Sequence, residues 1–395
     1  MARVVHVAPW FAPAWGFGGP PRSLLALCRA QVEAGLDVEV FTTTANPGTP
    51  LPPAPEGREI EGVRARYFPL SAPSALLGAS TMSRPLEAAL AAADVAHVHG
   101  LFNRTTWMAA RLARLAGTPT VLSPRGMLQP AALAHHRRRK RLAWLLADRS
   151  VVRDAAMLHA TSADERVALH AYEAQPHPRV VEIPNPVGVD AVSPADVATA
   201  RREAGLQDEW PFVLFLGRVH PIKRLDLLAD AFTRLARQHP TVHLVIAGPD
   251  ERGHRAVVEP RFAAVAGRVR WCGVVDGAAK TGLLAGASAL VACSDSESFG
   301  MSIAEALAAG TPVVVTETCP WPVVAEAGLG HWVPQTAEAV AAALARVLAS
   351  PDEARAQGAR ARVWAAAHLS PAAVGSRWRD VYEGLADRGR GRSGA

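Results

Sequence analysis

Residues 289–317, ALVACSDSESFGMSIAEALAAGTPVVVTE, read in order as a short apolar run, a polar loop, an alanine-rich segment and a second apolar run. Both apolar runs are continuous, which is typical of strands that are buried on both faces of a parallel sheet. The alanine-rich segment between them has the composition of a crossover helix. The stretch therefore predicts one strand, helix, strand unit of an α/β fold.

The same alternation recurs along the whole chain. Apolar runs stand at RVVHVAP, DVEVFTTT, VAHVHG, PTVLSP, AMLHATS and VVEIPN before a Pro/Val/Asp-rich stretch at 183–197, and at PFVLFLG, HLVIAG, VRWCG, ALVACS and PVVVTE after it. Because 395 residues are too many for one ordinary core, we expect two doubly wound, Rossmann-like domains facing a central cleft. The expected parts are an N-terminal domain (1–190), a C-terminal domain (191–370), a helix that packs back toward the N-terminal domain (371–387) and a disordered tail (388–395).

Charge and composition narrow the classes of function. A net charge of +6 and a pI near 9.6 favour an anionic partner, such as a nucleotide, a nucleic acid or an acidic membrane surface. No apolar stretch approaches the ~20 residues that span a bilayer, so we expect a cytoplasmic protein, at most peripheral on the inner face of the membrane. The four cysteines show no metal-ligand spacing, and we expect reduced, buried thiols at Cys28, Cys272, Cys293 and Cys319.

Two cations follow the apolar run that ends at Gly217. Arg218 and Lys223 stand on a proline-containing loop ahead of a helical segment. Arginine offers a planar fork of donors and lysine a compact point charge, a pair that suits a diphosphate. The alternative is that both are ordinary surface cations of a loop.

Two acids flank the helix start in the opening stretch. Glu297 lies in the loop and Glu305 in the second turn of the helix, so both can face one crevice. The backbone around Phe299, Gly300 and Met301 offers free N–H groups to a phosphate, and glycine allows a close approach. Glu305 is a candidate for binding a ribose diol and Glu297 for sugar hydroxyls. A solvated helix residue is the alternative for Glu305.

These residues in this order resemble the retaining glycosyltransferases of family 4, which have the GT-B fold. The similarity rests on Gly217-Arg218, Lys223, the segment from Glu297 to Glu305 and the Gly310-Thr311-Pro312 turn. It extends to residues 17–44, FGGPPRSLLALCRAQVEAGLDVEVFTTT, which look like the family's glycine loop, first helix and second strand. SPRGMLQPAAL (123–133) and CPWPVVAEAGLGHWV (319–333) resemble members that build bacterial surface polysaccharides or exopolysaccharides.

The resemblance implies a metal-independent enzyme without a cofactor that moves a hexose from a UDP- or GDP-sugar to a hydroxyl of a glycan or lipid-linked glycan. The acceptor attacks on the face from which the diphosphate leaves. The implied catalytic residues are Arg218, Lys223 and Glu297. The implied donor-binding residues are Gly18 and Gly19 at the diphosphate, Gly273 and Val274 at the base, the Phe299, Gly300 and Met301 backbone, and Glu305 at the ribose. Consistently, the sequence has no Asp-x-Asp motif for a divalent metal.

The sequence departs from the family at two positions. Arg125 stands where many relatives carry a histidine that meets the donor sugar, and Pro186 stands where the family has a glycine before its linker. Arg125 and His99 are therefore candidates for the acceptor or sugar side. For His99, a packed or capping histidine is the alternative.

The basic segment 135–149, HHRRRKRLAWLLADR, has two interpretations. One is the solvated start of a helix. The other is a contact with an anionic membrane, where each basic residue adds about 1 kcal/mol.

Three rival functions remain for comparison. A nicotinamide-dependent oxidoreductase fits poorly because Pro21 occupies the place of the third glycine in its fingerprint. Nucleic-acid binding fits poorly because no aromatic residues interleave the arginine runs, so we expect no nucleic-acid partner. Another GT-B activity, such as a nucleotide-sugar epimerase or a phosphorylase, shares the same pair of sheets.

Overall fold

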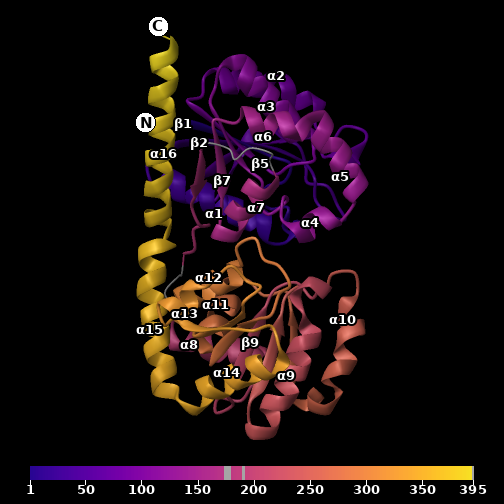
Figure 1. The fold of residues 1–395 in the computed structure, drawn as a ribbon, viewed down its shortest axis with the longest axis vertical. Coiled ribbons are helices and arrows are strands. Elements are labelled where there is room, and N and C mark those ends of the chain that lie inside the picture. The colour runs from indigo at the N-terminus through magenta and orange to yellow at the C-terminus, as the bar shows by residue number, and fades with distance from the viewer. Residues whose placement is uncertain (173–178, 189–191, 394–395) are drawn as a thin grey trace. The chain divides into compact units, whose positions relative to one another are not determined.

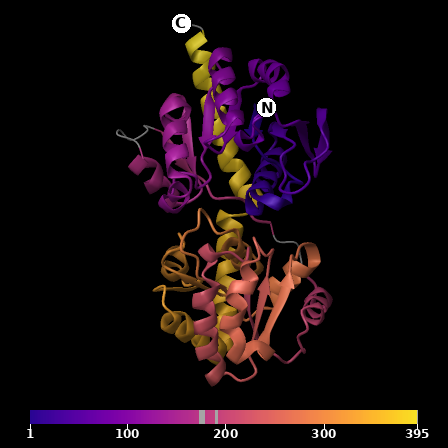
Figure 2. The same ribbon diagram turned by 90° about the vertical axis from the view of Figure 1, so that its right-hand side faces the viewer.

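The structure is a computed structural model that describes residues 1–172, 179–188 and 192–393 (Figures 1 and 2). The chain forms two compact units: an N-terminal unit of residues 1–186 and 371–395, and a C-terminal unit of residues 187–370. These bounds lie close to the expected division, and the C-terminal segment belongs to the first unit. The linker expected over 183–197 includes residues 189–191, which lie outside the described residues.

The N-terminal unit is built on an eight-stranded sheet with the order β3-β4-β2-β1-β5-β6-β7-β8. All neighbours are parallel except β3 and β4. The strands are β1 (Arg3–Ala8), β2 (Asp37–Thr43), β3 (Ala54–Ile60), β4 (Val63–Phe68), β5 (Val95–His99), β6 (Thr120–Ser123), β7 (Met157–Ala160) and β8 (Val180–Glu182). The six predicted strands of this half are confirmed. The pair β3 and β4 at the edge was not predicted, because its charged residues break the apolar pattern.

Helices cover both faces of this sheet (Figure 1). They are α1 (Gly19–Glu33), α2 (Ser83–Ala91), α3 (Arg104–Ala116), α4 (Pro130–Ala134), α5 (Arg137–Ala143), α6 (Arg149–Asp154), α7 (Ala163–Tyr172) and α16 (Pro371–Ser393). Short 3₁₀ turns occupy Trp15–Phe17, Ser74–Leu76 and Ser80–Met82, and a π turn occupies Trp144–Asp148.

The C-terminal helix α16 completes the core of the N-terminal unit. Trp378, Tyr382 and Leu385 are buried in the same apolar cluster as residues of β1 and α1. The helix continues to Ser393, where the sequence predicted an end at 387 and a disordered tail. Extending a helix that is already packed fixes only one residue for each new hydrogen bond, which is the physical reason for the longer helix.

The C-terminal unit is built on six parallel strands with the order β11-β10-β9-β12-β13-β14. The strands are β9 (Phe212–Leu216), β10 (His243–Ala247), β11 (Val269–Gly273), β12 (Ala289–Ala292), β13 (Val313–Thr316) and β14 (Gly330–Val333). The five predicted strands are confirmed, and the half-buried edge strand β14 was not predicted. The chain order reverses between β9 and β12, so this unit has a topological switch point there.

Two apolar clusters fill the two faces of this sheet. The helices that cover them are α8 (Pro194–Glu203), α9 (Leu225–Gln238), α10 (His254–Val258), α11 (Gly277–Gly286), α12 (Met301–Ala309), α13 (Val323–Glu326), α14 (Ala337–Ala349) and α15 (Pro351–His368), with 3₁₀ turns at Pro221–Lys223 and Glu259–Arg268. The opening stretch of the sequence forms β12, α12 and β13, as predicted.

The close approach of α16 to α1 generates a test. A Cβ atom at Gly375 would overlap the carbonyl oxygen of Ala30, so Gly375→Ala must push α16 away from α1. We expect a loss of about 1–3 kcal/mol in the free energy of unfolding, measured by denaturant titration. Gly384→Ala is the matched control, because a Cβ there meets only the end of Arg388 at 4.0 Å. The control should keep or gain stability, and equal losses in the two variants would contradict the packing.

Candidate active site

The loop after β9 carries the two predicted cations. The Gly217 carbonyl group packs against Gly248, in the loop after β10, so closely that a Cβ atom at Gly248 would overlap it. This close approach fixes where the loop leaves the sheet. Arg218 then forms an ion pair with Glu251, and a 3₁₀ turn that begins at Pro221 ends with Lys223. Glu251 was not predicted, because sequence alone gives no sign of which distant acid meets an arginine.

The structure brings Lys223 and Glu297 together. The Lys223 ammonium donates to the Glu297 carboxylate, which also accepts a hydrogen bond from Ser294 Oγ at 2.8 Å. The two side chains are only 17% and 13% exposed. The pair forms because β9 and β12 are neighbours in the sheet, so the loops at their carboxyl ends lie side by side.

A second contact ties the same two loops together. The Arg224 guanidinium binds Asp226 at 3.0 Å and Asp295 at 2.9 Å, and the Asp295 N–H donates to the Ile222 carbonyl at 2.8 Å. The hydrogen bonds to both carboxylates raise the pKa of Arg224. Arg224 therefore holds the loops in register while Lys223 and Glu297 face each other.

The start of α12 has the geometry that its sequence predicts. Gly300 has a φ of +87°, and a Cβ atom there would lie 2.9 Å from Ile303 Cδ1. The N-cap residue, Gly300, has no side chain to cap the helix, and its carbonyl group accepts from the Ile303 N–H at 3.0 Å, so Met301 and Ser302 provide the first N–H groups of the helix. The Phe299 side chain is buried against Trp321, whose indole N–H donates to the Phe299 carbonyl group. A ligand would therefore meet the backbone of this segment and not the phenyl ring.

Glu305 has a basic partner. Its carboxylate lies 3.0 Å from Lys280 Nζ on the neighbouring helix α11, and both side chains are partly exposed. The partner was not predicted, and the expected solvated alternative for Glu305 does not describe this position. A ribose bound by Glu305 would also contact Lys280.

Gly273 and Val274 follow β11. Gly273 has a φ of +64°, and its carbonyl group accepts a hydrogen bond from the Gly248 N–H at 2.6 Å. The Val274 side chain is 64% exposed, at the end of the half-buried edge strand β11. This apolar surface is available for one face of a flat ring.

The glycine loop lies at the start of α1, in the N-terminal unit. Gly18 has a φ of +77°, its N–H donates to the Trp15 carbonyl, and the helix begins at Gly19. The next two residues, Pro20 and Pro21, have no N–H. Gly19 is therefore the one backbone donor among the first three residues of α1.

His99 and Arg125 also belong to the N-terminal unit and contact each other. Arg125 Nε donates to His99 Nδ1 at 3.1 Å. His99 is fully buried, and burial holds its pKa well below the usual range, so it is a packed, neutral histidine. Burial also lowers the pKa of Arg125 to about 10, which leaves it charged at neutral pH. Their roles at the sugar or acceptor side stay predictions.

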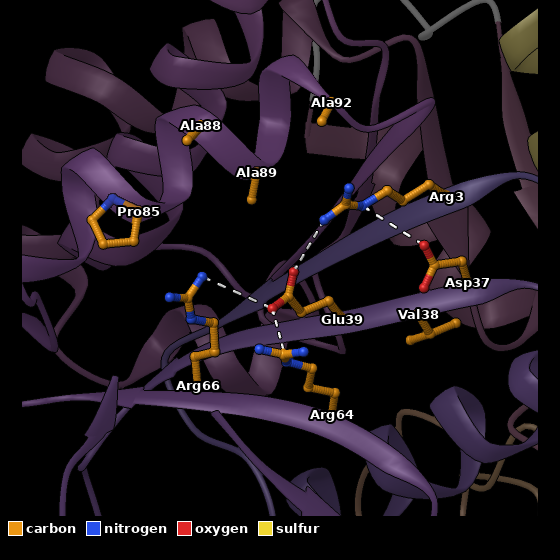
Figure 3. Close-up of a pocket in the computed structure, with 10 residues that line it drawn as sticks. All are labelled: Arg3, Asp37, Val38, Glu39, Arg64, Arg66, Pro85, Ala88, Ala89 and Ala92. Carbon is orange, nitrogen blue, oxygen red and sulfur yellow. Dashed lines mark ion pairs between the residues drawn. The ribbon is translucent and has the colours of Figure 1, made fainter. Parts of the chain in front are cut away.

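A hollow of about 700 Å³ lies in the N-terminal unit, at the end of the sheet away from Arg125 (Figure 3). Its floor holds the Glu39 carboxylate, with Arg3 and Arg64 each at 3.5 Å and Arg66 at 3.9 Å. Arg3 opens β1, so this hollow lies at the amino ends of the strands, whereas Arg125 follows a carboxyl end. No predicted site residue lines it.

Two family models match this chain. Residues 18–186 match the glycosyl transferase 4-like domain, and residues 196–364 match the glycosyl transferases group 1. Curated relatives include the D-inositol 3-phosphate glycosyltransferases of Geodermatophilus obscurus (30% identical, covering 78% of this chain and 73% of the relative) and Streptomyces scabiei (30% identical, 92% and 85%).

Solved structures give the fold. Anabaena HepE in complex with UDP-glucose superposes with a TM-score of 0.75 at 16% identity, covering 97% of this chain and 100% of that one. The sucrose-phosphate synthase of Thermosynechococcus elongatus superposes with a TM-score of 0.74 at 20% identity, covering 98% and 99%. With both units matched by family models and a 30% identical relative aligned over most of its length, the chain belongs to the family 4 type of glycosyltransferases, with the GT-B fold.

Proposed function

We propose that this glycosyltransferase moves a hexose, with retention, from a UDP- or GDP-sugar to a hydroxyl of a glycan or lipid-linked glycan in surface polysaccharide or exopolysaccharide synthesis. The observation that carries the proposal is the Lys223–Glu297 pair beside Arg218, at the adjoining carboxyl ends of β9 and β12. Anabaena HepE, which shares the fold, has been solved with UDP and with UDP-glucose. That neighbour supports a nucleotide-sugar donor.

The cations have a defined task in this reaction. Breaking the anomeric bond expels a nucleoside diphosphate, and the charge that develops on its oxygens is stabilised by donors held in place beforehand. Arg218 provides a planar fork and Lys223 a point charge, each now paired with an acid. The diphosphate replaces Glu251 and Glu297 as the partner of these cations, and Glu297 then accepts hydrogen bonds from the sugar hydroxyls.

The helix start and Glu305 complete the donor site in this proposal. The uncapped N-terminus of α12 takes a phosphate, because its N–H groups and helix dipole favour negative charge. Glu305, which is paired with Lys280, accepts hydrogen bonds from the ribose. The exposed Val274 side chain contacts the base, and the choice between uracil and guanine is left to experiment.

The first test removes a cation. Lys223→Ala should lose the thermal stabilisation by UDP or GDP, which is about 2.7 kcal/mol for wild type at 100-fold Kd, and should lower kcat/KM by about 10²–10³-fold. Glu305→Ala should also lose the nucleotide-dependent shift. Arg234→Ala is the control, since Arg234 is an exposed cation of α9 paired with Glu338. Full nucleotide binding by both site variants would show that the donor site is elsewhere.

The second test concerns metal. Because the proposal assigns charge stabilisation to Arg218 and Lys223, we expect the rate of transfer to be unchanged after dialysis against EDTA. The assay follows release of the nucleoside diphosphate with and without acceptor. Loss of activity in EDTA that returns with Mg²⁺ or Mn²⁺ would contradict this assignment. Equal release without acceptor would favour another GT-B activity.

We also propose that the enzyme works in the cytoplasm as a peripheral protein on an anionic membrane, through residues 137–146, called here the basic leucine segment. Among the described residues no helix is both long and apolar enough to cross a membrane. The segment instead exposes Leu142, Leu145 and Leu146 by 58%, 63% and 76%, next to a run of exposed arginines. Exposed leucines beside cations are typical of a surface that inserts shallowly among acidic headgroups.

Vesicle sedimentation tests this contact. Arg137→Gln with Arg138→Gln should weaken binding to vesicles containing phosphatidylglycerol, as should Leu145→Ser with Leu146→Ser, while neutral phosphatidylcholine vesicles bind little in all cases. Arg111→Gln with Arg114→Gln removes the same charge from exposed positions on α3 and is the control. Unchanged sedimentation of both segment variants would rule out the basic leucine segment as the membrane contact.

A further inference from the structure

Four histidines lie in the core of the N-terminal unit. His6 is on β1, His97 and His99 are on β5, and His159 is on β7. Each is at most 2% exposed, and the rings pack against one another, with centroids of His97 and His99 4.1 Å apart. Buried polar groups persist only when they are hydrogen-bonded, so the pattern of their bonds defines what this cluster can do.

The bonds can be assigned from Arg125 inward. A guanidinium only donates, so His99 Nδ1 accepts from Arg125 Nε at 3.1 Å. The proton of neutral His99 is then on Nε2 and is donated to His6 Nδ1 at 2.9 Å. The same logic puts the His6 proton on Nε2, where it is donated to Gln31 Oε1 at 2.7 Å. This half of the assignment ends at the Gln31 amide.

The bonds can also be assigned from the other end. A carbonyl only accepts, so His159 Nε2 donates to the Ile183 carbonyl at 2.8 Å, and His159 Nδ1 accepts from the Ser123 hydroxyl at 2.6 Å. Ser123 has a single proton, so its oxygen accepts from His97 Nε2 at 2.6 Å. His97 Nδ1 must then accept from the Tyr382 hydroxyl, also at 2.6 Å.

The two assignments meet at Tyr382 without conflict. Gln31 Nε2 donates to the Tyr382 oxygen at 2.9 Å, and the Tyr382 proton goes to His97. Eight hydrogen bonds therefore point in one direction, from the Arg125 guanidinium to the Ile183 carbonyl. We call this series the histidine chain. It is complete only while all four histidines are neutral, because an extra proton would occupy the ring nitrogen that accepts and leave the donor that faces it without its acceptor.

We propose that Tyr382 of α16 is a positioning residue, whose hydroxyl joins the two halves of the histidine chain and thereby fixes the orientation of the Arg125 guanidinium. The proposal rests on the proposed function and on the prediction from the sequence that Arg125 lies at the acceptor or sugar side. Arg125 has a left-handed backbone with a φ of +53°, which a non-glycine residue keeps only when its surroundings hold it there. The histidine chain holds Arg125 in place through the hydrogen bond from Arg125 Nε to His99.

The other two nitrogens of the Arg125 guanidinium, Nη1 and Nη2, differ in their hydrogen bonding. Its Nη1 donates to Ser23 Oγ at 3.2 Å and to Asn185 Oδ1 at 3.4 Å. The Nη2 atom is buried and has no hydrogen-bond partner in the part of the chain that the structure describes. A guanidinium fixed at Nε and Nη1 presents Nη2 in one direction, which is what recognition of a substrate oxygen requires.

A bound metal is the other reading of these side chains. His6, His97 and His99 each offer a ring nitrogen, and these atoms lie within 4.8 Å of one another. A metal would need lone pairs that the chain already uses, and it would lie near the Arg125 cation. Zinc is therefore not expected to bind, and zinc titration is one arm of the test.

Nitrogen NMR of histidine-labelled protein tests the chain without relying on activity. We expect all four buried rings to show the Nε2–H tautomer, unchanged between pH 5.5 and 8 and unchanged by zinc. Burial holds the pKa of His6 and of His159 to about 3, which agrees with neutral rings over this range. An Nδ1–H tautomer, a charged ring at pH 7, or a zinc-dependent shift at any of the four would overturn the assignment.

Kinetics test the positioning role. Tyr382→Phe keeps the packed ring, removes the hydroxyl and should lower kcat/KM about five- to tenfold, as expected for one lost hydrogen bond, with nucleotide binding unchanged. Trp378→Phe is the control, because Trp378 packs against the Tyr382, His97 and His159 rings and makes none of the eight hydrogen bonds of the histidine chain. It should lower stability while kcat/KM stays near wild type.

A double variant completes the test. Arg125→Met should lower kcat/KM, and adding Tyr382→Phe to it should cost nothing more if Tyr382 acts through Arg125. Additive losses of kcat/KM in the double variant, or equal losses in Tyr382→Phe and Trp378→Phe, would contradict the positioning role. If wild type transfers no sugar with any donor, the proposed function fails, while the NMR result still decides whether the histidine chain exists.

Discussion

The side-by-side pairing of β9 with β12 is the constraint on which the proposed donor site depends. Because the strand order reverses there, two loops that are distant in sequence leave the sheet as neighbours. Lys223 and Glu297 meet across those loops, and Arg224 locks the loops together through Asp295. The glycines at 248 and 300 serve the same arrangement, since a Cβ atom would come too close to the Gly217 carbonyl group at the first and to the Ile303 side chain at the second.

Much of the fold was predictable from the sequence because the strands of a covered parallel sheet are mostly continuous apolar runs, and eleven such runs are strands of the two sheets. The strands β3 and β4 were not predicted because charged residues such as Arg58, Arg64 and Arg66 interrupt their apolar pattern, and β14 is a short edge strand that is only half buried. The Lys223–Glu297 contact could be predicted from the sequence, since both residues follow strand ends. Glu251, Lys280 and Tyr382 were not, because a distant partner leaves no local pattern.

The two units hold their key cations by different physical means. In the C-terminal unit, Arg218 and Lys223 are paired with carboxylates, which under the proposed function give way to the diphosphate. In the N-terminal unit, Arg125 is held by the neutral ring of His99, with Glu165 the nearby charge that favours its protonated form. Neutral acceptors fix a direction in space without cancelling the charge. The first arrangement suits release of a diphosphate, and the second suits orientation of a neutral sugar.

The N-terminal unit is discontinuous in sequence, and this affects how the protein is made. Its core needs Trp378 and Tyr382, which a ribosome adds only after the whole C-terminal unit, residues 187–370, has been synthesised. The inserted unit can therefore fold during translation, whereas the unit that begins the chain is finished last. Until α16 docks, the histidine chain lacks Tyr382, and a nascent or truncated polypeptide exposes the apolar residues that α16 covers, which chaperones and proteases can recognise.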